Sequence, residues 1–218
     1  MSQNLIPYHT FAMLEVSNFT KSYGDQTILT IDSLQLKPGV HLIKGDNGSG
    51  KTTFFKCLAG ILPFKGRVSL DKLSLLESPI AYRYRVNFAE AEPLYPGFLT
   101  SKDLIRFIGK TKQASKDQQA WYTSKLGVDS FYEKACDTYS SGMMKKLSLV
   151  LAFLGNPKMI ILDEPLITLD KQTREDLFAL IRQKAETIFL LSSHQPIENN
   201  LLPINTTFII HQKTLHVE

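Results

Sequence analysis

One short stretch of the chain combines glycines, a lysine and two threonines at a spacing that binds phosphate. It reads Gly45-Asp46-Asn47-Gly48-Ser49-Gly50-Lys51-Thr52-Thr53. This fits the pattern G-x-x-x-x-G-K-[ST], in which backbone N–H groups of a glycine-rich loop surround anionic oxygens. Lys51 adds a positive charge for the β- and γ-phosphates of a nucleotide, and the hydroxyl of Thr52 suits Mg²⁺. We therefore expect a site for a nucleoside triphosphate with Mg²⁺.

The elements that must position this loop are visible on either side of it. Residues 40–43 are a run that predicts a strand, and residues 53–59 predict a helix that ends at Gly60. A helix that starts at the loop directs its N-terminal amides and its dipole toward the same anion. A chance glycine-rich turn is the alternative, and the strand and the helix together argue against it.

Two adjacent carboxylates provide a second chemical group. Met159-Ile160-Ile161-Leu162 is fully apolar, as expected for a strand of a parallel sheet covered on both faces, and Asp163-Glu164-Pro165 follows it. The carboxyl end of such a strand lies beside the phosphate loop. We expect Asp163 to complete the Mg²⁺ site with Thr52, and Glu164 to act as general base on an attacking water. The alternative for two adjacent acids is a turn or a helix N-cap.

A histidine follows another apolar strand. His194 comes after residues 187–191 and the pair Ser192-Ser193. A lone histidine is usually structural, but one at the end of a sheet where ligands bind can contact a γ-phosphate and respond to hydrolysis. We therefore include His194 in the predicted site.

The order of strands and helices predicts an α/β fold with a mainly parallel sheet. Residues 1–12 read as an N-terminal tail, and residues 13–218 as one domain with a helical subdomain inserted at about 95–150. Within the helical part we expect Trp121 to be a core residue and the polar run 110–116 to be solvated surface. Cys57 lies on the helix that follows the loop, where we expect a small core residue rather than a reactive thiol.

The composition excludes several classes of protein. The chain has 218 residues, 43% hydrophobic and 21% charged, and its net charge of +4 is too small to argue for nucleic acid. The two cysteines have no metal-ligand spacing. No apolar run reaches the roughly 18–20 residues of a membrane span, and no secretory signal is visible. We expect a cytoplasmic protein, held at a membrane only through a partner.

From Leu14 to Glu218 the motifs follow the order of one family, and the chain resembles the nucleotide-binding domain of an ABC transporter. Residues 45–53 resemble the Walker A loop and residues 159–164 resemble Walker B with its catalytic glutamate. Leu169-Asp170 resembles the D-loop, His194 the switch histidine, and Tyr23 the aromatic residue that stacks on adenine. The resemblance implies a P-loop NTPase fold of the RecA type with a small antiparallel β subdomain.

Two motifs depart from the family pattern. Where Leu-Ser-Gly-Gly-Gln is expected as the signature, this chain has Tyr139-Ser140-Ser141-Gly142-Met143. The resemblance implies that Ser140, Ser141 and Gly142 contact ATP bound to a partner cassette, and a helix N-terminus keeps that anion-binding ability. The resemblance places Glu90 in the Q-loop, where the family often has glutamine, and implies that its carboxylate is a metal ligand. Glu92 is the alternative for that position.

The resemblance implies an ATPase that uses ATP and Mg²⁺, with Lys51, Glu164 and His194 as catalytic residues. Two cassettes, identical or different, would form a dimer that drives a separate integral membrane permease at the inner face of the cell membrane, with no direct role for nucleic acid. A second hypothesis is a non-transport ABC ATPase acting on ribosomes or DNA, although neither a second cassette nor a coiled-coil insertion is visible. A third is a poorly hydrolysing cassette in a heterodimer, which Met143 and Glu90 favour and Glu164 and His194 oppose.

Overall fold

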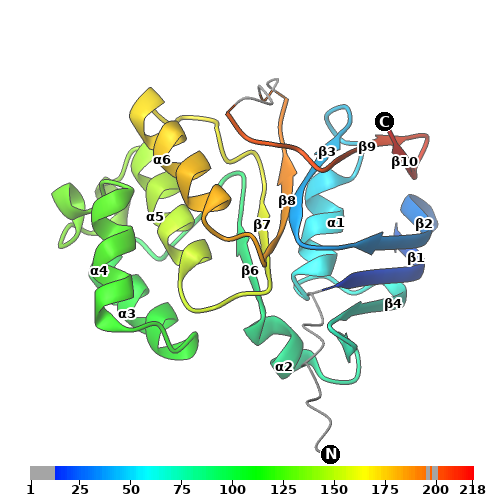
Figure 1. Cartoon of the computed structure of the whole chain (residues 1–218), viewed down its shortest axis with the longest axis horizontal. Coiled ribbons are helices and arrows are strands. Elements are labelled where there is room, and N and C mark those ends of the chain that lie inside the picture. Colours follow the sequence, from blue (N-terminus) through cyan, green and yellow to red (C-terminus); the bar gives the residue numbers. More distant parts are fainter. Residues whose placement is uncertain (1–12, 195–196, 198–200) are drawn as a thin grey trace, which may run out of the picture.

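The computed structural model describes residues 13–194, 197 and 201–218 (Figure 1). The predicted tail at 1–12 lies outside the described residues. The strands are β1 (Leu14–Tyr23), β2 (Gln26–Leu36), β3 (Gly39–Lys44), β4 (Lys65–Leu70), β5 (Leu73–Ser74), β6 (Val86–Ala89), β7 (Met159–Leu162), β8 (Ile188–Ser192), β9 (Thr206–His211) and β10 (Thr214–Val217). The helices are α1 (Lys51–Leu58), α2 (Pro79–Tyr84), α3 (Ser101–Thr111), α4 (Lys116–Lys125), α5 (Ser141–Phe153) and α6 (Lys171–Arg182).

The described strands form one mixed sheet in the order β5-β4-β1-β2-β10-β9-β3-β8-β7-β6. From β9 to β6 all neighbours are parallel, whereas β1, β2, β4 and β5 pair antiparallel. The two halves meet at β10 and β2, which share a single registered pair, Thr214 with Thr30. The mainly parallel core, the antiparallel β part and the inserted helices confirm the predicted α/β architecture.

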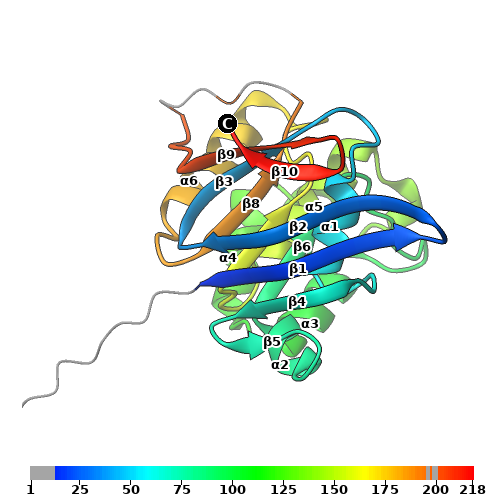
Figure 2. The same ribbon diagram turned by 90° about the vertical axis from the view of Figure 1, so that its right-hand side faces the viewer.

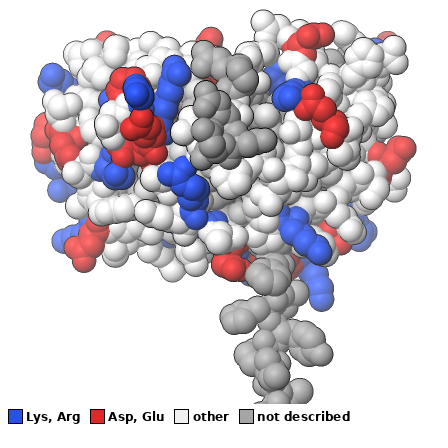
Figure 3. Space-filling view, turned by 45° about the horizontal axis from the view of Figure 1, so that its top comes forward, with Lys and Arg blue, Asp and Glu red and all other residues white. Residues whose placement is uncertain are grey.

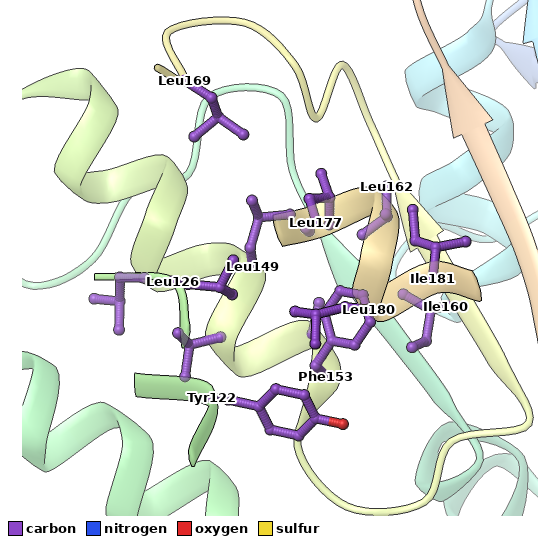
Figure 4. Close-up of a cluster of buried hydrophobic side chains, with 14 of the residues drawn as sticks. Tyr122, Leu126, Leu149, Phe153, Ile160, Leu162, Leu169, Leu177, Leu180 and Ile181 are labelled. Carbon is purple, nitrogen blue, oxygen red and sulfur yellow. The ribbon is translucent and has the colours of Figure 1, made fainter. Parts of the chain in front are cut away.

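The central strands are apolar because both of their faces are buried. Ile160 and Leu162 of β7 belong to one hydrophobic core, and Met159 and Ile161 to the other. Alternation along a strand sends successive side chains to opposite faces, so a strand covered on both sides carries no polar face. Figure 4 shows the first core, where Leu149 and Phe153 of α5 and Leu177, Leu180 and Ile181 of α6 surround Ile160 and Leu162.

The second core holds helix α1 against both halves of the sheet. Phe54 and Phe55 of α1 are buried, and the ring of Phe54 packs edge-on against Phe19 of β1 at 5.4 Å between centroids. In Figure 2, β1, β2 and β4 cross in front of α1. Cys57 is fully buried here, as predicted, and burial raises the pKa of its thiol to about 11. Helix α1 is therefore packed against both halves of the sheet.

The helical subdomain differs from the predicted helical block in its details. Helices α3, α4 and α5 cover 101–111, 116–125 and 141–153, and the connections contain short 3-10 turns at Asp129–Phe131 and Cys136–Thr138. Just after the ends of α3 and α4, the backbone turns at Gln113 and Gly127, both of which have positive φ. Thr100 caps α3 with a reciprocal bond to Asp103, and Ser115 caps α4. Local capping and turns therefore divide the block into separate helices.

One prediction within this subdomain is wrong, and a second, the solvated run 110–116, holds except at Lys112 and Ala114, which are half-buried. Trp121 is 45% exposed, and its neighbour Tyr122 is buried instead, with its ring 5.6 Å from that of Phe153. A helix turns by about 100° per residue, so an error of one position exchanges a buried side chain for an exposed one. Lys112, within the run expected to be solvated, is half-buried and donates to the carbonyl oxygens of Arg83, Tyr84 and Val86.

No described helix has the length and apolar character needed to cross a membrane.

The two buried faces of β7 generate a test of the core. Replacing Leu162, which is fully buried, with Ala should lower the free energy of unfolding by about 2–5 kcal/mol, because it removes apolar contacts and leaves a cavity. The matched control is Leu94→Ala at a side chain that is 90% exposed, where the change should stay within about 0.5 kcal/mol. Urea unfolding measures both. Equal losses in the two variants would contradict this account of the core.

Candidate nucleotide-binding site

The glycine-rich loop lies between β3 and α1, as predicted. Gly45, Gly48 and Gly50 all have positive φ, at 151°, 78° and 106°. A Cβ atom on Gly45 would lie 2.6 Å from Ser49 Oγ and 3.0 Å from the carbonyl oxygen of Ile210, so no larger residue fits there without a shift. Gly50 is the N-cap of α1, and the first helical residue is Lys51. The loop backbone thus curls around the N-terminus of a buried helix.

Lys51 spans the mouth of this loop. Its Nζ atom donates to the carbonyl oxygens of Gly45 and Asp46, at 2.7 and 3.1 Å, and the residue is only 7% exposed. The Oγ atom of Ser49 is buried without a hydrogen-bond partner among the described residues. A buried cation held only by carbonyls, beside an unsatisfied hydroxyl and a glycine cradle, fits a phosphate chain.

Asp163 joins three elements at the end of β7. Its Oδ2 atom accepts from the hydroxyl of Thr52 on α1 at 2.6 Å, and its Oδ1 atom accepts from the hydroxyl of Ser192 on β8 at 2.6 Å. Asp163 is buried. Among the described residues no group of three or more His, Cys, Asp or Glu side chains could hold a metal. A carboxylate with one hydroxyl fits Mg²⁺, which is usually held by few protein ligands together with substrate phosphates and waters.

Glu164 is held in an unusual backbone conformation next to this carboxylate. Its φ is +46°, in the left-handed region that side chains larger than glycine rarely adopt, and its N–H donates to Ser192 Oγ at 2.9 Å. The Oε2 atom accepts from the backbone N–H of His194 at 3.2 Å, and Oε1 lies 3.4 Å from His194 Nε2. The strained backbone turns the Glu164 side chain away from Asp163 and toward His194.

These groups line one cavity. It has a volume of about 310 Å³ and is lined by Ile28, the loop and helix start from Asn47 to Thr53, Asp163, Glu164 and His194. A larger cavity of about 910 Å³, between α3 and α4, contains none of the predicted site residues.

Figure 3 views the molecule with the top of Figure 1 brought forward. Charges of both signs are interspersed among the described residues on that face.

The structure does not bring every predicted residue into this cavity. Tyr23 lies at the end of β1, 52% exposed, with Lys21 Nζ 4.4 Å from its ring centroid. Glu90 directly follows β6, and its carboxylate pairs with Lys56 of α1 at 2.9 Å, whereas Glu92 is exposed. The strand register places residue 89 opposite Leu162, so residue 90 lies at the sheet edge beside Asp163.

The signature residues lie at the start of α5, away from the cavity of the same chain. Ser140 is the N-cap, and its Oγ accepts from the N–H of Met143 at 3.3 Å. Ser140 and Ser141 are exposed, and a Cβ on Gly142 would lie 3.1 Å from the carbonyl oxygen of Thr168. The Tyr139 hydroxyl accepts from Ser101 N and donates toward the carbonyl oxygen of Lys134 at 2.9 Å. Tyrosine here therefore ties the signature to the start of α3.

Sequence reasoning missed two residues of this region. The sequence suggests only a link at Ser192, yet this residue is fully buried and bonds to both Asp163 and Glu164. Lys145 of α5, 2% exposed, donates to the carbonyl oxygens of Glu90, Ala91 and Asp163. A polar residue at the end of an apolar strand was a readable signal for Ser192. A lysine among the apolar residues of α5 was the signal for Lys145.

Known proteins resemble this chain in sequence. A profile described as ABC transporter matches residues 29–167. The linearmycin resistance ATP-binding protein LnrL of Bacillus subtilis (strain 168) is 28% identical over 182 residues, 80% of this chain and 58% of that protein. The spermidine/putrescine import ATP-binding protein PotA of Mesoplasma florum is 31% identical over 196 residues, 85% of this chain and 55% of that protein. The chain thus spans little more than half the length of these two relatives.

Two solved structures share the fold. One, described as an ATP binding subunit of an ABC transporter, has a TM-score of 0.82 at 23% identity and covers 94% of this chain and 90% of that one. A bacterial Atm1-family ABC exporter with ATP bound has a TM-score of 0.80 at 17% identity, covering 94% of this chain and 38% of the exporter chain. At these identities the likeness speaks for the fold, and it confirms the predicted P-loop NTPase class.

The bonds of Ser192 generate a stability test. Ser192→Ala should lower the free energy of unfolding by about 1–3 kcal/mol, because it leaves a buried carboxylate oxygen and the N–H of Glu164 without a partner. Ser124→Ala, at an exposed serine of α4, is the matched control and should stay within about 0.5 kcal/mol. Denaturant melts of both variants measure the difference, and a neutral Ser192→Ala would show that the network does not stabilise the fold.

Proposed function

Because the chain belongs to the ABC transporter family, we propose that it is an ATP-hydrolysing subunit that drives a separate membrane permease. The observation that carries the proposal is the arrangement of Lys51, Asp163 and Glu164 around one cavity at the end of the parallel strands. Residues 13–218 then act as one cassette, with the helical subdomain at about 95–150 as the inserted part.

ATP binding rests on the loop and on helix α1. The loop N–H groups and the N-terminus of α1 bind phosphate oxygens, and Lys51 exchanges its carbonyl partners for the β- and γ-phosphates. Thr52 and Asp163 would hold Mg²⁺, and Glu90 would join them by giving up its pair with Lys56. When bound, Mg²⁺ neutralises charge that develops on the transferring phosphoryl group. Tyr23 provides a ring surface for adenine.

Hydrolysis uses the carboxylate that the backbone turns toward His194. Glu164 accepts a proton from a water whose oxygen attacks the γ-phosphorus, while the bond from that phosphorus to the β-γ bridging oxygen breaks. The products are ADP and inorganic phosphate. His194 donates to the γ-phosphate, and Lys51 with the loop amides stabilises the negative charge of the transition state.

The position of the signature supports a two-copy site. Ser140, Ser141 and Gly142 lie at a helix N-terminus that is exposed and does not line the cavity of their own chain. A second cassette, identical or different, placed about a two-fold axis would bring this N-terminus to the γ-phosphate of the first. ATP then joins the two cassettes, and hydrolysis separates them.

The names of the relatives support a transport role. A third relative is the lantibiotic transport ATP-binding protein SrtF of Streptococcus pyogenes, which is 29% identical over 84% of this chain and 80% of its own. The names of LnrL, PotA and SrtF refer to resistance, import and transport. We place the protein in the cytoplasm at the inner face of the cell membrane, bound to a permease. The transported substrate is a property of that permease.

The proposed general base can be tested directly. Glu164→Gln should reduce ATP hydrolysis by about 10²–10⁴-fold, because an amide cannot accept the proton, while ATP binding persists. ATP should then trap a dimer, measured by size-exclusion chromatography with light scattering. The matched control Glu186→Gln, at an exposed carboxylate, should hydrolyse ATP as the natural chain does. Unchanged turnover in Glu164→Gln would refute the role of Glu164.

The phosphate-binding lysine gives an independent test. Lys51→Ala should weaken ATP binding by about 10–100-fold, because a charged donor to the phosphates is lost. Lys65→Ala, at an exposed lysine of β4, is the control and should bind as before. Equilibrium titration with a fluorescent ATP analogue measures both. Equal affinities would remove Lys51 from the binding site.

The proposed partnership with a permease can be tested by capturing the tagged chain from detergent-solubilised cells and identifying the proteins bound to it by mass spectrometry. A stoichiometric polytopic membrane protein is expected. Stoichiometric ribosomal or DNA-repair proteins in its place would overturn the transport role and leave the ATPase chemistry.

A further inference from the structure

Two lysines of the helical subdomain, the half-buried Lys112 and the buried Lys145, bond to the backbone at the two ends of strand β6. Lys112, just after α3, bonds to the carbonyl oxygens of Arg83, Tyr84 and Val86, at 2.7, 3.1 and 2.9 Å, where β6 begins. Lys145 of α5 bonds to the carbonyl oxygens of residues 90 and 91, where β6 has just ended. Strand β6 lies at the edge of the sheet beside β7. Both ammonium groups therefore join the subdomain to the sheet through backbone oxygens.

Lys145 differs from Lys112 in one contact. Its Nζ atom lies 2.9 Å from the carbonyl oxygen of Glu90 and 3.4 Å from that of Asp163. Asp163 is the residue whose carboxylate holds Thr52 and Ser192. Lys145 also lies on the second turn of the helix that begins at Ser141. One side chain thus joins the signature helix to the Q-loop backbone and to the residue that directly follows β7.

We propose that Lys145 is a positioning residue of the nucleotide site, which holds the backbone of Asp163 and of the Q-loop at a fixed distance from the signature helix. It contacts neither ATP nor the reacting water. By fixing the Asp163 carbonyl, it fixes the direction in which the Asp163 and Glu164 side chains leave the end of β7. By fixing residues 90 and 91, it makes the Q-loop follow any movement of α5.

The chemistry of Lys145 separates this role from simple packing. No carboxylate among the described residues lies within ion-pair distance of its ammonium group, although the residue is 2% exposed. Burial lowers its pKa to about 8, and the charges of Asp163, Glu164 and Glu92 oppose that shift. An apolar side chain of the same length would fill this space without the cost of burying a charge. Lysine adds three hydrogen bonds that link α5 to the Q-loop backbone and to Asp163.

The inference rests on the proposed ATPase function, and its first test does not depend on hydrolysis. The N–H of Asp163 donates to Ala89 O, and that of Glu164 to Ser192 Oγ, both at 2.9 Å. In Lys145→Met, amide hydrogen exchange at residues 163 and 164 should become about tenfold faster, because the carbonyl anchor of this turn is lost. Lys112→Met is the matched control, since Lys112 also binds three carbonyls and has a pKa lowered by burial to about 8. It should leave those amides unchanged.

The second test separates turnover from binding. In Lys145→Met, kcat for ATP hydrolysis should fall about tenfold or more with KM within about twofold, the range seen when a group that orients ligating residues is removed. Lys112→Met should keep kcat within about twofold of the natural chain. Lys145→Gln, which keeps two N–H donors and is the variant to use if Lys145→Met does not fold, should lie between the two.

The outcomes are distinguishable. Unchanged exchange at residues 163 and 164 in the Lys145 variants overturns the positioning role, whatever their turnover. Equal losses of kcat in Lys145→Met and Lys112→Met assign both lysines to stability alone and also overturn it. A natural chain that binds ATP without hydrolysing it overturns the proposed function, and the exchange result still decides the role of Lys145.

Discussion

The structure depends on one buried carboxylate that is shared by three elements. Asp163 directly follows β7 and accepts from Thr52 of α1 and from Ser192 of β8. A buried carboxylate without donors would cost several kcal/mol, so these hydroxyls must stay within bonding distance for the fold to be stable. The same requirement sets the separation between the phosphate loop, the end of β7 and the end of β8. The fold and the geometry of the candidate site therefore have a common cause.

The apolar strands make this arrangement rigid. Strands β7 and β8 are buried along their whole length, with α5 and α6 on one face and α1 with the antiparallel strands on the other. Polar residues occur only where these strands end, at Asp163 and Ser192. The site is thus the first place along each strand where a polar side chain can find partners. Its floor is the close-packed core, which deforms little when a ligand binds.

Local patterns in the sequence predicted the parts of this site whose geometry is local. The loop from Gly45 to Thr53 forms because its own glycines allow the turn, and β7 was predicted with its observed ends. The helix after the loop begins two residues earlier than expected, which puts Lys51 in its first turn. The roles of Ser192, Lys112 and Lys145 depend on partners far along the chain, and no local pattern shows where a side chain will find a distant carbonyl. The error at Trp121 has a different origin, because neighbouring aromatic residues make the buried face of α4 ambiguous.

The narrow junction between β2 and β10 has a mechanical consequence. Elsewhere in the sheet, neighbouring strands are joined by ladders, but here one registered pair and the bond from Thr30 N to Lys213 O connect the antiparallel half to the parallel half. Side chains of both halves that pack on α1 also hold the two halves together. Among the described strands, this junction has the fewest registered pairs. Side-chain packing on α1, more than a strand ladder, therefore sets where Tyr23 lies relative to the phosphate loop.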